Sequence, residues 1–257
     1  MIEIKTPQEV EAMRPAAQLV ADCLSELKDM TKVGMNLLEI DEYTHKRIAD
    51  YKGASSPYVD DDEMGTVPFG HWICTSVNDV VLHGVPHDYA LKDGDLLSLD
   101  LSIAVDGWCG DSAISFVVGD HARPEDLHLI KATEDALAAA IDQCHAGNHL
   151  GDVSAAAGAV AHERGYEVNT VFGGHGIGRD MHCDPYVPND GRAHRGYRLR
   201  PGLVICIEPW LMAGTDEIAE DPDGWSVHSA DGSRGAHTEH EICITDGDPI
   251  IMTARRK

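Results

Sequence analysis

The chain has 257 residues with 44 acidic and 20 basic side chains, and its formal net charge of −24 disfavours tight binding to DNA, RNA or anionic membranes. No apolar run is long enough to span a bilayer, and the first residues, MIEIKTPQEV, are not followed by the apolar segment of a signal peptide. The seven cysteines are odd in number and never form a CxxC pair, which argues against a disulfide framework or a thiolate zinc site and favours a reducing, cytoplasmic location.

Four helices are expected along the chain. The first begins with a capping box in Thr6-Pro7-Gln8-Glu9, and apolar residues then recur at helical spacing as far as Leu27. Pro15 interrupts this pattern, so we expect a kink there or a later start of the helix. Further helices are predicted at about 37–52, 124–145 and 152–164, and strands at about 72–82, 95–104, 109–118, 168–175, 203–209 and 238–245. Helices and strands in similar amounts, without strict alternation, predict the α+β class.

A hairpin is predicted where two of these strands adjoin. Alternation in 96–104 puts Asp100 on a polar face, and Asp106-Gly107 is a common hairpin turn. Counting back from the turn places Asp111 of the returning strand almost opposite Asp100. Two carboxylates this close repel each other, and no lysine or arginine lies within the pair. The hairpin therefore predicts a bound cation.

Four segments of the first half recur in the same order in the second half. GMNLLEID (34–41) resembles GNHLGDVS (147–154), HGV (83–85) resembles HGI (175–177), LKDGDLLSLDL (91–101) resembles LRPGLVICIEP (199–209), and GWCGD (107–111) resembles GAHTE (235–239). The alignment pairs Asp100 with Glu208 and Asp111 with Glu239. We therefore expect one domain over 1–257 with an internal duplication, whose halves lie at about 1–122 and 123–257.

The matched positions supply four carboxylates, which together with a histidine suit two divalent ions whose charges balance theirs. Oxygen and nitrogen donors without thiolate favour manganese, iron or cobalt, with zinc as a further option. A metal pair about 3.5–4 Å apart can activate a water molecule and stabilise the transition state of hydrolysis, as in aminopeptidases.

The segment GGHGIGRDMHCDP (173–185) sets two histidines, His175 and His182, in glycine-rich backbone. Glycine permits close approach of the chain and positive φ, but it weakens regular helix or strand. Two hypotheses remain open: a surface loop with incidental histidines, or backbone shaped to bring both imidazoles to one point.

Six segments resemble, in order and spacing, those of type I methionine aminopeptidases: TSVNDVVLHGVP, LSLDLS, GWCGDSAISFVVG, GGHGIGRDMHCDP, ICIEPWLMAG and DGWSVHSADGSRGAHTEHEICIT. The resemblance covers nearly the whole chain and implies the pseudo-twofold pita-bread fold, an α+β fold in which helices cover antiparallel sheets. It also implies that Asp111 and Glu239 bridge two metal ions. Asp100 would bind one ion, and His175 and Glu208 the other.

The resemblance further implies a hydrolase activity, the removal of N-terminal methionine from nascent proteins and peptides whose second residue is small. Metal-bound hydroxide would attack the first peptide bond, with Glu208 as a proton shuttle as well as a ligand. His182 would hydrogen-bond the scissile carbonyl, and His83 would lie on the opposite side, near the scissile amide nitrogen or the next residue. The methionine pocket would be lined by Phe69, Cys74, Met181 and Trp225. We also expect the protein to be a cytoplasmic monomer that acts near the ribosome and has no DNA or membrane partner.

One region departs from the family pattern. Before Cys74 the chain reads MGTVPFGHWIC, where the family usually has an aromatic residue, a polar residue, Gly-Phe-Pro and a basic residue, and SSPYVDDDE precedes this stretch. The rim of the methionine pocket is therefore expected to differ. The acidic run at 60–63 is expected to be a solvated loop rather than a calcium-binding loop, and Glu241 is expected at the surface.

Two alternatives remain open. An Xaa-Pro peptidase of the prolidase kind shares the five ligands, but it usually carries a large amino-terminal domain, and SVNDVVLHGVP disfavours it. A non-catalytic binding protein on the same fold typically loses ligands, whereas all five matched positions are retained here.

Overall fold

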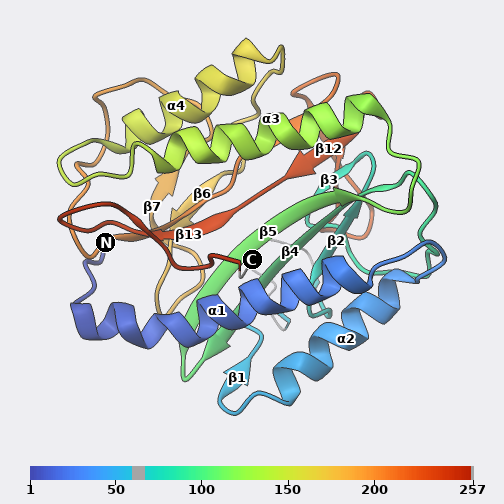
Figure 1. Cartoon of the computed structure of the whole chain (residues 1–257), viewed down its shortest axis with the longest axis horizontal. Coiled ribbons are helices and arrows are strands. Elements are labelled where there is room, and N and C mark those ends of the chain that lie inside the picture. The colour runs from blue at the N-terminus through green and yellow to red at the C-terminus, as the bar shows by residue number, and fades with distance from the viewer. Residues whose placement is uncertain (60–66, 256–257) are drawn as a thin grey trace.

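The computed structural model describes residues 1–59 and 67–255 of the chain, so the predicted acidic loop at 60–63 lies outside the described residues. Within the described part, four helices and antiparallel sheets confirm the α+β class (Figure 1). The helices are α1 (Pro7–Met30), α2 (Leu37–Ala49), α3 (Pro124–Ile141) and α4 (Leu150–Glu163). None of the described helices is long and apolar enough to cross a membrane.

The described strands form four antiparallel sheets. The first contains β1 (Ala54–Ser55), β4 (Leu96–Val105), β2 (Cys74–Val77) and β5 (Trp108–Val117). The largest, in spatial order, contains β14 (Ile250–Ile251), β13 (His240–Cys243), β8 (Val204–Ile207), β6 (Gly174–Gly176) and β7 (Cys183–Val187). The two smaller sheets contain β10 (Ile218–Glu220), β11 (Val227–Ser229) and β3 (Val80–Leu82), and β12 (Gly235–His237) with β9 (Trp210–Met212).

Helix α1 runs from Pro7 to Met30 and includes Pro15, so of the two alternatives expected at Pro15 the later start is wrong. The capping box forms as predicted, because the Glu9 N–H donates to Thr6 Oγ1 at 3.3 Å and the Thr6 N–H donates to Glu9 Oε2 at 2.7 Å. A proline inside a helix costs about 3 kcal/mol. Burial of a long apolar face, which includes Leu24 and Leu27, stabilises the helix by more than this.

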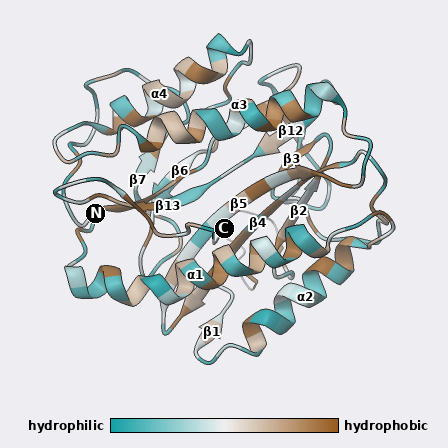
Figure 2. Ribbon diagram, in the orientation of Figure 1, coloured by the Kyte–Doolittle hydropathy of each residue, from teal (hydrophilic) through white to brown (hydrophobic). Residues whose placement is uncertain are grey.

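The helices lie in two pairs on either side of the strands (Figure 1). Helix α1 packs on β4 and β5, whereas α3 packs on α4 and β12. Apolar and polar residues alternate along the helical ribbons, as expected when one helix face is buried and the other is solvated (Figure 2). One core cluster joins Leu24 of α1, Ile40 of α2 and Leu99 of β4. The strands are thereby left free to carry polar side chains on their other face, between the two helix pairs.

The hairpin of β4 and β5 has the predicted two-residue turn, in which Asp106 has a φ of 51° and Gly107 a φ of 75°. Its register pairs Asp100 with Ala113, and Asp111 with Ser102. The two acidic residues therefore lie on one face, as predicted, but diagonally, two positions from direct opposition. Diagonal neighbours on a sheet still lie within reach of a shared ligand.

Two other strand predictions differ from the structure, and several short strands were not predicted. The stretch 72–82 contains two strands, β2 and β3, and the strand expected at 168–175 begins only at Gly174. The short strands β9 to β12 have no predicted counterpart, because three residues carry too little alternation to be recognised.

Candidate active site

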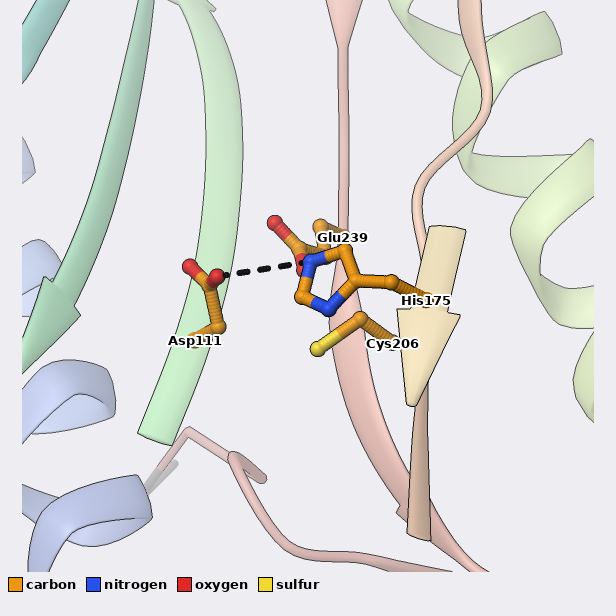
Figure 3. Close-up of side chains that lie close together, drawn as sticks. All are labelled: Asp111, His175, Cys206 and Glu239. Atoms are coloured by element: carbon orange, nitrogen blue, oxygen red, sulfur yellow. Dashed lines mark ion pairs between the residues drawn. The ribbon is translucent and has the colours of Figure 1, made fainter. Parts of the chain in front are cut away.

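Five side chains that lie far apart in the sequence converge at the centre of the molecule. Asp100 lies on β4, Asp111 on β5 and His175 on β6, whereas Glu208 directly follows β8 and Glu239 separates β12 from β13. His175 Nε2 is 3.7 Å from Asp111 Oδ2 and 3.6 Å from Glu208 Oε1. Figure 3 shows Asp111 directed across the gap between the sheets toward His175 and Glu239.

The separations of these atoms fit ligands of a shared metal ion. Values of 3.6 and 3.7 Å are too long for a direct hydrogen bond. Two donor atoms that bind one ion at about 2.1 Å each, with an angle of about 120° between them, lie about 3.6 Å apart. Carboxylate and imidazole donors suit divalent ions such as manganese, iron, cobalt and zinc, so the donor set fits a divalent metal.

The buried carboxyl groups of the cluster need positive charge nearby in order to be ionised. Asp111 is 5% exposed and Glu239 is 2% exposed, and Glu239 Oε1 has no hydrogen-bond partner among the described residues. Burial raises the pKa of Asp111 and of Glu239 well above the usual range of carboxyl groups. Burial also raises the pKa of Asp100 to about 7, and burial together with Asp100 raises the pKa of Glu208 to about 8. Ionised carboxylates are therefore costly here unless cations lie between them.

His175 is suited to act as a neutral ligand. Burial, with a smaller contribution from His182, lowers the pKa of His175 to about 3, so its ring is uncharged at neutral pH. Its Nδ1 lies 3.0 Å from the carbonyl oxygen of Gly176. When Nδ1–H donates to that carbonyl, the lone pair of Nε2 faces Asp111 and Glu208.

The two histidines of 173–185 are brought to one point, which favours the second hypothesis for this segment. The rings of His175 and His182 meet edge to face with centroids 4.5 Å apart. A Cβ on Gly174 would lie 2.1 Å from the Cys206 carbonyl oxygen, and a Cβ on Gly176 would lie 2.1 Å from the carbonyl oxygen of Asp184. The glycines are needed because β6 passes this close to its neighbouring strands.

Cys206 belongs to the same cluster, although no cysteine was predicted among the metal ligands. One ligand atom each of Asp111, His175, Cys206 and Glu239 lies within 4.8 Å of all the others (Figure 3). Burial, followed by the Glu239 carboxyl, raises the pKa of the Cys206 thiol well above its usual range. Two-residue alternation along β8 puts Cys206 on the same face as Glu208, and this signal could have identified it from the sequence.

A second imidazole, that of His237, also faces the carboxylates and was not predicted. It is 2% exposed, with Nδ1 at 4.0 Å from Asp100 Oδ2 and Nε2 at 3.8 Å from Glu208 Oε2. Burial, with a smaller contribution from His83, lowers the pKa of His237 to about 3. His237 is the last residue of β12, a strand too short to be recognised from its pattern.

A pocket opens directly onto this cluster. It is lined by Tyr58, Phe69, Cys74, His83, Asp100, Ser102, Asp111, Met181, His182 and Trp225. The structure thus places all six residues that were predicted to contact substrate in one pocket, together with Asp100 and Asp111. Tyr58 and Ser102 were not predicted.

The apolar wall of the pocket is built from aromatic rings. Phe69 packs edge-on against Tyr58 and Trp225, with ring centroids 5.5 and 5.3 Å apart, respectively. The Trp225 Nε1–H donates to the Val67 carbonyl oxygen at 2.8 Å, which joins this wall to the segment before Phe69. A slot of aromatic rings, with Cys74 and Met181 beside them, suits a polarisable thioether side chain.

The segment that departs from the family pattern is fastened to α2. The Trp72 N–H donates to Asp41 Oδ1 at 2.6 Å, and His71 Nδ1 lies 2.7 Å from Asp41 Oδ2. The Trp72 ring stacks on His45 at 4.1 Å. Neither His71 nor Trp72 lines the pocket, so these unusual residues anchor its rim from outside.

His83 also lines the pocket. Its φ of 53° lies in the left-handed region, which is uncommon for residues other than glycine. Its ring packs edge-on against Phe172 with centroids 5.2 Å apart. Burial, followed by His182, lowers the pKa of His83 to about 4, so this imidazole is neutral at pH 7.

The expected surface position of Glu241 is wrong, because this side chain is 0% exposed. Glu241 pairs with Cys206 across β13 and β8, and the sheet is covered on the face where the side chain lies. Neither carboxylate oxygen has a hydrogen-bond partner among the described residues. Burial raises its pKa to about 8, so Glu241 is a neutral carboxylic acid at pH 7 in the folded protein.

Comparison with known proteins identifies relatives over the full length. Residues 11–246 match metallopeptidase family M24. A methionine aminopeptidase of Aquifex aeolicus is 37% identical over 256 residues, which cover 98% of each chain. The crystal structure of methionine aminopeptidase from Rickettsia prowazekii is similar with a TM-score of 0.92 at 34% identity, covering 99% of this chain and 100% of that one. A prolidase from Pyrococcus horikoshii has a TM-score of 0.76 at 20% identity, and the match covers 99% of this chain but 64% of the prolidase, which shows a common fold alone.

Proposed function

The chain belongs to metallopeptidase family M24, and we propose that it is a methionine aminopeptidase, which removes N-terminal methionine when the second residue is small. Relatives with that name cover the chain from end to end, and its fold is the pita-bread fold that they share. One observation carries the proposal. The aromatic, sulfur-containing pocket and the carboxylate cluster are a single site, because Asp100 and Asp111 belong to both.

Family M24 enzymes are metallopeptidases, and we assign two divalent ions to this site. Asp111 and Glu239 would be shared by both ions, with Asp100 on one of them and His175 and Glu208 on the other. Manganese, iron or cobalt suit these donors, and zinc is a further option. Bound divalent ions supply a water molecule of lowered pKa and stabilise the negative charge that develops during hydrolysis.

The remaining polar side chains act on the peptide itself. His182 lies beside His175 and lines the pocket, where its imidazole would donate a hydrogen bond to the scissile carbonyl oxygen. His83 lies across the pocket and, being neutral, can hydrogen-bond the scissile amide nitrogen region. A Glu208 carboxylate oxygen would take a proton from the attacking water and deliver it to the leaving amine nitrogen.

The pocket sets the preference for the first residue. Phe69, Cys74, Met181 and Trp225 would enclose the methionine side chain. The apolar wall offers no partner to a charged or amide side chain, so such residues would lose hydrogen bonds with water on entering. The preference for a small second residue would follow from the space that remains between His83 and His182.

Assays of peptide cleavage test this proposal. Metal-stripped protein would be mixed with Met-Ala-Ser or Met-Leu-Ser peptides, with manganese, iron, cobalt or zinc restored, beside the Asp111→Asn variant. We expect metal-dependent release of methionine from Met-Ala-Ser only, and loss of that release in Asp111→Asn. Intact peptide under every metal would refute the proposal. Cleavage of an Ala-Pro peptide instead would support the Xaa-Pro alternative.

We further propose a cytoplasmic monomer that acts on nascent chains near the ribosome. The high negative charge makes tight contact with ribosomal RNA unfavourable, so substrate capture would depend on the pocket. We also propose that the chain is one duplicated domain, with halves at about 1–122 and 123–257. This proposal is supported by the pairing of Asp100 with Glu208, and of Asp111 with Glu239, in the sequence alignment of the halves. Light scattering of the purified protein would test the monomer.

A further inference from the structure

We propose that His237 is a further protein ligand of the metal centre, with Nε2 on the ion that Glu208 binds. This inference rests on the proposed metallopeptidase function, since it concerns the same site. It adds a second imidazole to a donor set in which the sequence identified one.

The position of His237 mirrors that of His175 across Glu208. His175 Nε2 lies 3.6 Å from Glu208 Oε1, and His237 Nε2 lies 3.8 Å from Glu208 Oε2. The second nitrogen of His237 lies 4.0 Å from Asp100 Oδ2, and His175 Nε2 lies 3.7 Å from Asp111 Oδ2. The two Nε2–Glu208 separations are similar, and both exceed a hydrogen bond, as expected for two donor atoms that share one ion across a wide angle. The geometry that qualifies His175 as a ligand therefore also qualifies His237.

The hydrogen-bonding capacity of the ring leads to the same conclusion. A neutral imidazole has one N–H donor and one acceptor nitrogen. Each nitrogen of His237 faces a carboxylate, so when Asp100 and Glu208 are ionised the acceptor nitrogen faces an oxygen that is also an acceptor. Nε2 is buried without a hydrogen-bond partner among the described residues. A cation between Nε2 and Glu208 removes this conflict and leaves Nδ1–H directed toward the Asp100 carboxylate, 4.0 Å away.

The backbone holds the ring in place. The His237 N–H donates to Ser115 Oγ at 2.8 Å, and Ser115 Oγ lies 2.7 Å from the carbonyl oxygen of His237. Ser115 Oγ is also 2.7 Å from Ser98 Oγ of β4. This clamp joins β12 to the hairpin that carries Asp100 and Asp111, so the donor atoms of His237 are preorganised relative to those carboxylates.

Cobalt binding by matched variants tests the inference. Wild-type protein and the variants His237→Ala, His237→Gln, His175→Ala and His240→Gln would be titrated with Co²⁺ by calorimetry, and their imidazole ligands counted by X-ray absorption. Circular dichroism melting would establish that each variant is folded. His240→Gln is the control, since His240 is a neighbouring, partly buried histidine whose Nδ1 lies 2.9 Å from Thr253 Oγ1.

We expect His237→Ala and His237→Gln each to weaken one Co²⁺ site by at least about tenfold and to remove one imidazole, as His175→Ala does. The His240→Gln control should match the wild type. If His237→Gln retains wild-type affinity and an unchanged imidazole count, His237 only donates a hydrogen bond, and the inference is overturned. If the wild type itself binds no Co²⁺, the proposed metallopeptidase function fails together with it. If the wild type binds Co²⁺ and His237→Ala binds it equally, only this inference fails.

Discussion

Replacing the buried Glu241 with glutamine should stabilise the metal-free protein at neutral pH and change it little near pH 4.5. Burial removes this carboxyl group from water, and the nearby backbone of Asp111 and the Lys5 ammonium offset only part of the penalty. The folded state therefore keeps the group protonated, with a pKa of about 8 in place of 4.5. Glutamine fills nearly the same space and carries no ionisable proton.

The magnitude follows from proton linkage. Between pH 4.5 and 8 the folded state binds a proton at Glu241 that the unfolded state has released, so the contribution of Glu241 to the free energy of unfolding falls by about 1.4 kcal/mol per pH unit. From pH 4.5 to pH 7 the loss amounts to about 3 kcal/mol. The Glu241→Gln variant does not suffer this loss. In a chain of this length, about 3 kcal/mol corresponds to a Tm difference of roughly 6–12 °C.

Thermal melts in chelator at pH 5, 6, 7 and 8 measure this effect. The Tm of Glu241→Gln minus that of the wild type should grow steadily with pH and level off near pH 8. The variant Glu217→Gln removes an exposed carboxyl group and should show no such trend. A Tm difference that stays constant across this range would refute the reasoning, since it would mean that Glu241 is ionised in the folded protein.

Three further outcomes are expected. Removal of metal should lower the Tm more at pH 8 than at pH 5. In the metal-free protein Asp100 and Glu208 keep their protons up to about pH 7 and 8 and then ionise without a counter-charge. Calorimetry with and without Mn²⁺ measures the difference, and an equal loss of Tm at both pH values would contradict this expectation. His182→Ala should lower kcat/KM on Met-Ala-Ser by about 10²–10³ and leave Co²⁺ affinity unchanged; a parallel loss of metal would instead assign His182 to the metal site. Gly174→Ala should weaken Co²⁺ binding, because the added Cβ displaces β6 from the Cys206 carbonyl oxygen. The control Gly247→Ala should not weaken it, because the added Cβ there would lie 3.8 Å from its nearest atom. Equal Co²⁺ affinities of the two variants would show that β6 tolerates the Cβ.

The parts of the site that the sequence predicted depend on local rules. Strand alternation and the Asp106-Gly107 turn were enough to place Asp100 and Asp111 on one face, because hairpin register depends on a few neighbouring residues. The count back from the turn missed the diagonal offset of two positions. The glycine spacing around His175 likewise indicated a shaped backbone before its neighbours were known.

The parts that were missed depend on which elements cover a strand. Glu241 follows Glu239 by two residues, and its burial results from packing against other sheets, which its own sequence does not record. His237 lies on a three-residue strand whose partner, β9, is equally short, so neither gave a periodic signal. Cys206 is the exception among the missed residues, because strand alternation from Glu208 is a local signal that could have placed it on the ligand face.

The pocket rim is fastened at two places to parts of the chain far apart in sequence. The Val67 carbonyl accepts a hydrogen bond from Trp225. A few residues later, His71 and Trp72 contact Asp41 and His45 of α2. None of these attachments involves a residue of the carboxylate cluster. Side-chain selectivity can therefore diverge, or be redesigned, through the rim alone, while the machinery that breaks the peptide bond is inherited unchanged.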